Sequence, residues 1–533
     1  MPIGIQSIRK IIEDNYVYVD KTEYIYKLLN EGSYYFMSRP RRFGKSLLIS
    51  TMEEILKGNR QLFESCHIYS SDYEWKKHPV VHFDFTQIPT ESTADLERGL
   101  RETMDNIAAS YELSLKGTSL QLRLVSLIEQ LSVAGKVAIL VDEYDKPIID
   151  NLADDEIVSG NRDLIRRFFG TLKGLDSYLK IVFITGVSKF SQVSLFSGFN
   201  NLQDMTLRPE FSALFGYTEQ ELIDNFNPHL EAIAEKSLLS KDAVLDQIRV
   251  WYNGYQFSAN GTPVYNPFST LSYLDEGETQ GYWYRTGTPS FLIEQIRKLP
   301  QITTQLSGSV STASELLDIQ NTDSIDLKAL MWQTGYLTIR SYDSQTQLYL
   351  LDFPNKEVRS AFFNSLIKGF AQIDVSNVIK SAKQCFKDLE EHNLKAFFAT
   401  VNSHFAKITY NLSQHAKEGF YHAIFLSLLE CMNIPTRAEE QTNLGRIDLV
   451  CELAKTIYIF EFKIDQSSET AFTQIQMKNY AEKYTKSGKT LAVIGVNFDS
   501  KSRNISDWKA RIINPSGELI KELHSLYHIH AKR

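Results

Sequence analysis

The chain has 533 residues, too many for one compact core, and at about 150 residues per domain its length predicts roughly three or four domains. Its 43% hydrophobic and 23% charged residues exclude wholesale disorder and fibrous architecture. Lysine and arginine total 57 against 65 acidic residues, a net charge of −8. The chain as a whole is therefore not a basic nucleic-acid binder, although a local basic face stays open.

Three further features bear on where the protein works. No apolar run approaches the roughly 18 residues of a membrane span. The first residues, Met1–Ile5, lack the basic, apolar and small-residue order of a secretory signal. The four cysteines are scattered without CxxC spacing, which argues against a disulfide scaffold or a zinc module. These features predict a cytoplasmic protein with no membrane partner.

The first 200 residues alternate short β-branched or aromatic runs with longer amphipathic stretches. The expected strands are Tyr34–Ser38, Val80–Phe85, Val137–Asp142 and Ile181–Thr185, and the clearest expected helices are Ser46–Leu56 and Arg162–Leu179. Strands that alternate with helices indicate βαβ units and a mostly parallel sheet covered on both faces.

From about Thr218 the pattern becomes largely helical, and a second strand–helix pattern begins near Phe420. The expected helices of the middle are Glu219–Phe226, Ala243–Tyr252 and Ser290–Leu299. The second pattern comprises a helix at Tyr421–Cys431, strands at Arg446–Glu452 and Thr456–Lys463, a helix at Thr470–Thr485 and a strand at Thr490–Phe498. The chain is therefore expected to hold two α/β modules separated by a helical middle.

A phosphate-binding loop is predicted where Phe43-Gly44-Lys45-Ser46 follows a strand and opens a helix. Backbone N–H groups of such a turn surround a triphosphate, and the helix dipole favours anions there. Lys45 would reach the β and γ phosphates, and the Ser46 hydroxyl would hold Mg²⁺. The alternative is a chance Gly-Lys-Ser string at a helix start, which the strand–loop–helix context argues against.

The loop departs from the strict G-x-x-x-x-G-K-[ST] pattern because Arg39 stands at its first position. Its neighbour Pro40 lacks an N–H donor, but the most important donors lie nearer Gly44 and Ser46. Arg39, Arg41 and Arg42 can either meet phosphate or pair with acidic partners. An arginine finger cannot be chosen among them from sequence.

A second element supports the nucleotide site, since the apolar strand at Val137 ends in Asp142 and Glu143. Asp142 can order the Mg²⁺ shell, and Glu143 is placed to act as general base on the attacking water. In the alternative reading the acids pair with Lys146, which suits Asp145 better than Asp142. On the next strand, Thr185 and Ser188 either sense the γ-phosphate or form turns, two readings that the sequence leaves open.

A carboxylate–lysine arrangement marks the C-terminal module. Alternation puts Glu461 and Lys463 on one face of a strand while Phe460 and Phe462 face the core, and a hairpin would bring Asp448 beside them. Two carboxylates can bind Mg²⁺ or Mn²⁺, and a neighbouring lysine can orient water and stabilise charge at a scissile phosphate.

This is the D…(E)-x-K arrangement of metal-dependent nucleases. On spacing alone, an acid-x-base pattern is as readily a solvated, ion-paired strand face; the order of helix, acidic strand, E-x-K strand and helix favours a site. Glu418, at the start of the helix that precedes these strands, could supply a third carboxylate, and Gln474, on the following helix, could position substrate.

On the phosphate loop and the carboxylate–lysine arrangement together, the chain resembles a bacterial family that pairs an AAA-ATPase-like domain with a C-terminal PD-(D/E)XK nuclease domain. The resemblance covers nearly the whole length. It rests on Tyr18–Thr22, Ser38–Ser46, Ile139–Asp145, Ile184–Phe190, Phe196–Gly198, Trp251–Tyr255, Gly445–Asp448 and Glu461–Lys463. Arg39 in place of the first glycine is usual for this family, whereas Ile447 stands where the superfamily name has proline.

The resemblance implies an α/β protein with an N-terminal P-loop NTPase parallel sheet (residues 1–215), a mostly helical middle or lid (216–375) and a restriction-endonuclease-like α/β domain (376–533). It implies ATP and Mg²⁺ as cofactors, with Mn²⁺ as an alternative ion at the nuclease site. The implied nucleotide residues are Arg42, Phe43, Gly44, Lys45, Ser46 and Asp142, with Glu143 catalytic and with Ser46 and Asp142 on Mg²⁺. The implied nuclease residues are Asp448, Glu461 and Lys463, with Glu418 as a further metal ligand and Gln474 as an accessory.

The main hypothesis is an ATP-binding and ATP-hydrolysing protein whose nucleotide state controls a Mg²⁺-dependent nuclease, with DNA favoured as substrate. The alternative is a nucleotide-dependent switch or scaffold whose C-terminal fold binds without cutting. The middle region, with strings such as Trp251–Tyr255, Thr286–Thr288 and Thr334–Tyr336, can be a lid, a winged-helix contact or a coupling element. The sequence leaves open whether the chain forms a homo-oligomer.

Overall fold

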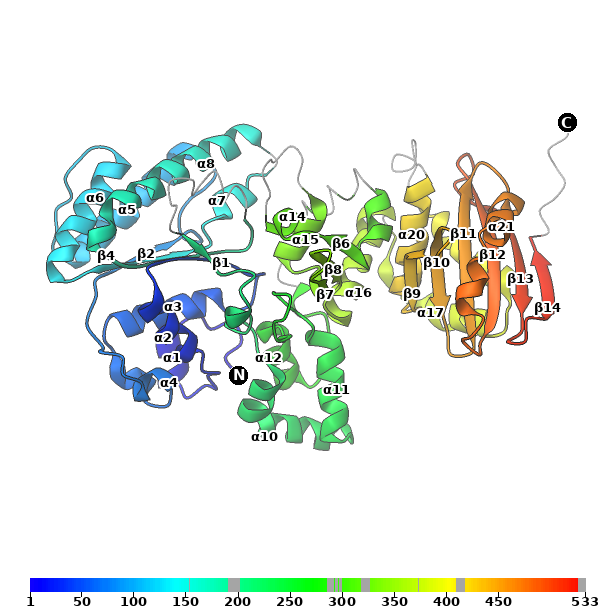
Figure 1. Cartoon of the computed structure of the whole chain (residues 1–533), viewed down its shortest axis with the longest axis horizontal. Coiled ribbons are helices and arrows are strands. Elements are labelled where there is room, and N and C mark those ends of the chain that lie inside the picture. The colour runs from blue at the N-terminus through cyan, green and yellow to red at the C-terminus, as the bar shows by residue number, and fades with distance from the viewer. Residues whose placement is uncertain are drawn as a thin grey trace. The chain divides into compact units, whose positions relative to one another are not determined.

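The computed structural model describes residues 1–152, 154–189, 202–284, 292, 296, 300–317, 326–371, 373–408 and 418–525. The chain folds as two compact units, the first made of Met1–Phe291 and Val310–Val358 and the second of Leu292–Ser309 and Arg359–Arg533. Residues 216–291 and 310–358 of the expected middle region therefore lie in the first unit (Figure 1). The three-part division at residues 215 and 375 stays a prediction.

The first unit contains a parallel five-stranded sheet of order β2-β3-β4-β1-β5. The strands are β1 (Tyr34–Ser38), β2 (Val80–Asp84), β3 (Val137–Asp142), β4 (Leu179–Gly186) and β5 (Gln203–Asp204). Every residue of β1 and β3 is buried, as expected for central strands of a sheet with both faces covered. The predicted parallel sheet is thus confirmed, with β5 as a short strand that the sequence pattern did not reveal.

Helices cover this sheet on both faces, with α1 to α4 on one side and α5 to α8 on the other (Figure 1). They are α1 (Ile8–Glu13), α2 (Thr22–Glu31), α3 (Lys45–Leu56), α4 (His67–Ser70), α5 (Thr93–Ser110), α6 (Leu120–Leu131), α7 (Lys146–Ile149) and α8 (Asp155–Gly170). The single helix expected over Arg162–Leu179 is wrong. The α-helix ends at Gly170 and a 3₁₀ segment, Thr171–Tyr178, follows it.

The remainder of the first unit is mixed rather than purely helical. Its elements are α10 (Glu219–Ser237), α11 (Lys241–Tyr252), α12 (Pro267–Glu276), β6 (Ser309–Ser311), α14 (Ala313–Leu317), α15 (Leu327–Thr334), β7 (Thr338–Asp343) and β8 (Leu348–Asp352), followed by α16 (Lys356–Leu366). The expectation of a helical middle missed the antiparallel hairpin of β7 and β8, whose turn uses Gln347 at φ 57°. The helix expected at Ser290–Leu299 lies outside the described residues except for Leu292 and Ile296, as do Phe190, Phe196–Gly198 and Thr286–Thr288.

A buried carboxyl group stands at the start of α16. Glu357 is 1% exposed, its Oε1 accepts a hydrogen bond of 2.7 Å from the backbone N–H of Trp283, and burial raises its pKa to about 7. An acid whose pKa is raised in the folded state binds more protons folded than unfolded. Its contribution to stability is therefore complete below about pH 4.5 and is lost as the pH rises to about 7.

Glu357→Gln tests this linkage. We expect the variant to gain stability relative to the wild type by about 2–3 kcal/mol between pH 5 and pH 8, because glutamine cannot ionise in the buried position. Thermal unfolding at both pH values measures the difference. Glu235→Gln, an exposed acid of α10 in the same unit, is the control. An offset that does not change with pH would contradict the prediction.

The second unit contains a six-stranded mixed sheet of order β14-β13-β12-β11-β10-β9. The strands are β9 (Thr436–Gln441), β10 (Arg446–Glu452), β11 (Thr456–Ile464), β12 (Thr490–Asp499), β13 (Asn504–Ile513) and β14 (Leu519–His524). Strands β10 and β11 form the expected antiparallel hairpin, and β11 runs parallel to β12. The sequence pattern missed β9, β13 and β14.

The helices of this unit are α17 (Val375–Glu390), α18 (Leu394–Phe405), α20 (Glu418–Cys431) and α21 (Ser468–Met477). Phe425 of α20 packs on Phe460 and Phe462, whereas Phe472 of α21 joins a core that contains Ile459. Successive residues of β11 thus face opposite layers. The expected helix Thr470–Thr485 is too long, since the α-helix ends at Met477 and a 3₁₀ turn, Tyr480–Tyr484, follows Asn479 at φ 46°.

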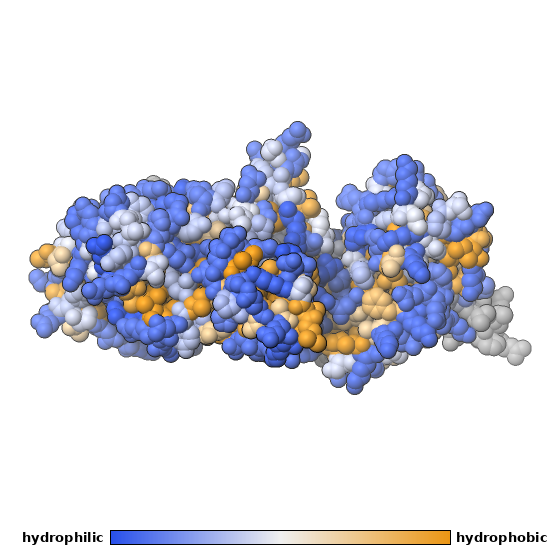
Figure 2. Space-filling model, turned by 90° about the horizontal axis from the view of Figure 1, so that it is seen from below, coloured by the Kyte–Doolittle hydropathy of each residue, from blue (hydrophilic) through white to orange (hydrophobic). Residues whose placement is uncertain are grey.

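Hydrophilic residues cover most of the face shown in Figure 2, and hydrophobic residues are interspersed among them. Across the described parts of the chain, no helix combines the length and the apolar character needed to cross a bilayer. All four cysteines are buried and free, so no disulfide links the parts of the fold.

Candidate functional site

The turn between β1 and α3 has the backbone shape of an anion-binding loop. Gly44 adopts φ 91° immediately before α3 begins at Lys45, and Arg42 adopts φ 69°. The first N–H groups of a helix have no partner within the helix and point out of its N-terminal end. Residues 42–46 therefore bring unpaired N–H groups and a positive helix terminus to the carboxyl edge of the sheet.

The predicted phosphate lysine lies inside this loop. Lys45 is 5% exposed, and its Nζ donates to the backbone carbonyls of Arg39 and Pro40 at 3.1 Å each. Burial lowers its pKa, which the negative charge of Glu143 opposes. A lysine held by backbone carbonyls alone is available for a phosphate, because a phosphate oxygen is a stronger acceptor than either carbonyl.

The two acids after β3 occupy different environments. Asp142 is 2% exposed, and its Oδ1 accepts a hydrogen bond of 2.7 Å from Thr185 Oγ1 of β4. Glu143 adopts φ 52°, and burial raises its pKa against the opposing charge of Lys45. A carboxylate with a raised pKa beside a phosphate loop is suited to accepting a proton.

Hydrogen bonds and ion pairs show what Thr185, Ser188 and Lys146 contact near these acids. Asp145 accepts hydrogen bonds from the N–H and Oγ of Ser188 at 2.6 and 2.7 Å, so Ser188 fixes a buried acid. Lys146 instead pairs with Asp150, which argues against the alternative reading in which it pairs with Asp145. Thr185 donates to Asp142, and sensing of the γ-phosphate by Thr185 or Ser188 stays a prediction.

The three arginines of the loop differ in their surroundings. Arg39 is 1% exposed, donates to the carbonyls of Ser38, Thr206 and Phe211, and lies 4.2 Å from the ring centroid of Phe257. Burial lowers its pKa to about 9. Its guanidinium is thus held by backbone carbonyls inside the fold, whereas Arg41 and Arg42 are exposed.

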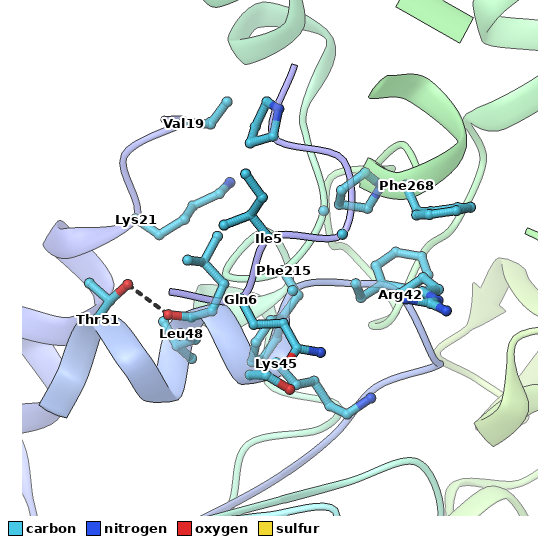
Figure 3. A pocket seen from close by; sticks show the side chains of 18 of the residues that line it. Ile5, Gln6, Val19, Lys21, Arg42, Lys45, Leu48, Thr51, Phe215 and Phe268 are labelled. Atoms are coloured by element: carbon cyan, nitrogen blue, oxygen red, sulfur yellow. Dashed lines mark hydrogen bonds between the residues drawn. The ribbon is translucent and has the colours of Figure 1, made fainter. Parts of the chain in front are cut away.

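A pocket of about 570 Å³ opens at this loop (Figure 3). Arg42, Phe43, Gly44, Lys45, Ser46 and Glu143 line it, and Asp142 does not. Its far wall comes from the N-terminal segment and from residues 214–217 and 267–271, including Ile5, Gln6, Phe215 and Phe268. The volume lies within the usual range for small-molecule sites, and a polar phosphate end meets an apolar end.

The C-terminal residues predicted as a triad come together on the β10–β11 hairpin. Asp448 Oδ2 accepts a hydrogen bond of 2.8 Å from the N–H of Phe462, which places Asp448 beside the segment that carries Glu461. Lys463 Nζ donates to Glu461 Oε1 at 3.0 Å. Gln474 of α21 donates to the same Oε1, as expected for a neighbour on that helix.

Acidic side chains lie close together here, in a part of the hairpin that water reaches poorly. Glu461 is 1% exposed, and its Oε2 is buried with no hydrogen-bond partner among the described residues. Burial and the nearby Glu461 raise the pKa of Asp448; burial also raises the pKa of Glu461, which Lys463 opposes. Two carboxyl groups, one buried and one partly buried, that are costly to ionise together fit a divalent cation, whose charge would stabilise both anions.

The structure adds two residues that the sequence analysis missed. Ligand atoms of His422 on α20, Glu439 on β9 and Asp448 on β10 all lie within 4.8 Å of one another. Burial lowers the pKa of His422 to about 3, so its imidazole is neutral and can bind a metal. His422 follows Glu418 by one helical turn, which is a usable sequence signal, whereas nothing in the sequence marks Glu439.

Glu418, predicted as a third carboxylate, lies near the other acids but outside the group of three candidate ligands. It is the first residue of α20, and its charge acts on both Glu461 and Lys463. The group of ligand atoms within 4.8 Å contains neither Glu418 nor Glu461. The metal ligands therefore stay predictions, with His422 and Glu439 added as candidates.

Comparison with known proteins finds matches at both ends of the chain. Residues 2–196 match the sequence model of a family described as a predicted AAA-ATPase, and residues 416–508 match that of the PD-(D/E)XK nuclease superfamily. A protein of Azotobacter chroococcum mcd 1, named for its place in the vnfD 5′ region, is 34% identical over 517 residues, which cover 95% of this chain and 97% of the relative. The ORC2 protein of Aeropyrum pernix, solved in ADPNP–ADP complexes, matches 65% of this chain and 93% of its own at 12% identity and a TM-score of 0.25, a likeness too distant to carry an argument.

The fold is thus an α/β combination of a parallel sheet with a phosphate-loop edge and a mixed nuclease-like sheet. The chain belongs to the family that joins an AAA-ATPase-like domain to a C-terminal PD-(D/E)XK nuclease superfamily domain, shared over almost its full length with the Azotobacter relative.

Proposed function

We propose that the protein binds and hydrolyses ATP in its first unit and cleaves nucleic acid, with DNA favoured, through a Mg²⁺-dependent site in its second unit. Mn²⁺ is expected to replace Mg²⁺ at the nuclease site, since both ions favour oxygen ligands. The buried free cysteines support the cytoplasm as the compartment, because thiols stay reduced there.

For the nucleotide, the support is the pocket at the phosphate loop. Lys45 and the N–H groups near Gly44 would bind the β and γ phosphates, and the Ser46 hydroxyl and Asp142 would hold Mg²⁺. Thr185 orients Asp142 by its hydrogen bond of 2.7 Å. Glu143 would take the proton of the attacking water, since its pKa is raised and its side chain lines the pocket.

For the nuclease, the single observation that carries the proposal is the state of Glu461. One of its oxygens is held by Lys463 and Gln474, while the other is buried without a hydrogen-bond partner in the described parts of the chain. A buried carboxylate oxygen left without a donor is costly, so the arrangement fits a cation as the missing partner.

Asp448 and Glu461 would hold this cation, with His422, Glu439 and Glu418 as further candidates. A divalent ion bound there supplies Lewis-acid stabilisation of phosphodiester charge and a more acidic water. Lys463 orients the attacking water and stabilises negative charge at the scissile phosphate. Gln474 fixes the rotamer of Glu461.

The test uses the full chain with labelled single- and double-stranded DNA, with Mg²⁺ or Mn²⁺, and with or without ATP. Cleavage that needs the metal establishes the nuclease, and its dependence on ATP reports whether the nucleotide controls it. Binding of Mn²⁺ by calorimetry is a second readout, and Asp448→Asn is expected to weaken it about 10–100-fold. A wild-type chain that neither binds Mn²⁺ nor cuts DNA or RNA would refute the nuclease and favour a non-cutting binding module.

A further inference from the structure

The phosphate loop packs against four residues from later parts of the first unit, Tyr255, Phe257, Trp283 and Gly335, which we call the supporting cluster. Phe43 of the loop is 1% exposed. Its ring centroid lies 4.8 Å from that of Tyr255 and 5.4 Å from that of Phe257, in edge-to-face contacts. Such contacts add specific geometry to the burial of the ring.

Trp283 makes a direct polar contact with the loop backbone. Its Nε1 donates a hydrogen bond of 3.1 Å to the carbonyl of Arg41. The indole is 5% exposed and its centroid lies 5.2 Å from that of Tyr336, so its position is fixed from the other side. The carbonyl of Arg41 is thereby held in one orientation.

Gly335 packs closely against Pro40 of the loop. It ends α15 at φ 89°, and a Cβ placed there would lie 2.7 Å from the Cβ of Pro40 and 2.8 Å from its Cγ. No side chain fits at this distance without a shift of the proline ring or of the turn. The string Thr334–Tyr336 therefore has a role beyond the helix end, since it sets the position of Pro40.

The contacts reach the phosphate lysine through the backbone. Lys45 Nζ donates to the carbonyls of Arg39 and Pro40, so a displacement of Pro40 moves an acceptor of Lys45. The first position of the loop is Arg39 rather than glycine, and its side chain lies over Phe257 of the same cluster. The loop is thus shaped by contacts from outside it at Arg39, Pro40, Arg41 and Phe43.

We propose that the supporting cluster holds the phosphate loop in its nucleotide-binding conformation, which makes Gly335 and Trp283 positioning residues for the triphosphate. The inference rests on the nucleotide site proposed above. A loop that is already ordered before binding loses less conformational entropy when it binds phosphate. This gives a function to the Trp251–Tyr255 and Thr334–Tyr336 strings, because Tyr255 of the first and Gly335 of the second contact the loop.

Titration of the full chain with MgADP by calorimetry tests the proposal. Gly335→Ala is expected to weaken MgADP binding at least about tenfold, and Trp283→Phe, which loses the Nε1 donor but keeps a ring, about fivefold. Gly277→Ala is the matched control, because Gly277 also ends a helix at positive φ, 78°, but its Cβ would meet only Ile233 at 4.0 Å. The control is expected to bind within about twofold of the wild type while losing comparable thermal stability.

The outcomes separate the two proposals. A wild-type chain that binds no MgADP overturns the nucleotide site and the supporting cluster together. A wild type that binds, with Gly335→Ala and Trp283→Phe binding equally well, overturns the cluster alone. If Gly335→Ala does not fold, Trp283→Phe decides, since it removes the donor to Arg41 while an aromatic ring still fills most of the indole site. Weaker binding by both variants with an unchanged Gly277→Ala supports the cluster.

Discussion

Lys463→Ala is expected to lower metal-dependent cleavage of DNA by about 10²–10³-fold while leaving Mn²⁺ binding within a few-fold of the wild type. The Lys463 ammonium lies 3.0 Å from Glu461 Oε1, and the charges of Asp448 and Glu418 act on it as well. Its loss removes the positive charge at the scissile phosphate but leaves the ligand oxygens in place. Cleavage rates at saturating Mn²⁺ and calorimetry with Mn²⁺ measure the two effects separately.

Lys489→Ala is the matched control for this experiment. Lys489 belongs to the same unit, is half-buried and donates to Glu452 at 2.8 Å, but it precedes β12. Lys463 pairs with Asn497 near the end of β12, so the two lysines lie at opposite ends of the sheet. The control should cleave like the wild type. Equal losses in both variants would contradict a specific role for Lys463 and point to a general effect of charge on DNA binding.

The nuclease hairpin was predictable because its signal is local. The two-residue period of β11 places Glu461 and Lys463 on one face, and the hairpin with β10 follows from a short connection. His422 and Glu439 reach Asp448 only through the packing of α20 and the addition of β9. Glu439 carries no pattern of its own, so its place depends on a strand pairing that sequence periodicity does not specify.

In the nucleotide module, too, local elements were predictable and long-range contacts were not. β1 and β3 were predicted with their observed bounds, because apolar runs bounded by turn residues mark buried parallel strands. The role of Arg39 was not predictable, since its guanidinium binds carbonyls of Thr206 and Phe211 more than 160 residues away. Gly335 reads as an ordinary helix end in sequence, and only the fold brings Pro40 against it.

Glu143→Gln is expected to retain ATP binding within a few-fold and to reduce ATP hydrolysis by about 10²–10⁴-fold. Glutamine keeps the shape of the side chain at φ 52° but cannot accept the proton of the attacking water. Calorimetry with ATP and phosphate release on the same preparation separate binding from turnover. Glu129→Gln, an exposed acid of α6, is the control and should match the wild type.

Lys45→Ala completes this test, because it removes the charge that binds the phosphates instead of the base. Binding and hydrolysis should then fall together, whereas Glu143→Gln loses only hydrolysis. If ATP controls the nuclease through its bound state, DNA cleavage should follow ATP occupancy, so it would be preserved in Glu143→Gln and altered in Lys45→Ala. Wild-type turnover in Glu143→Gln would refute the assignment of the base, and unchanged nucleotide binding and cleavage in Lys45→Ala would refute the proposed control.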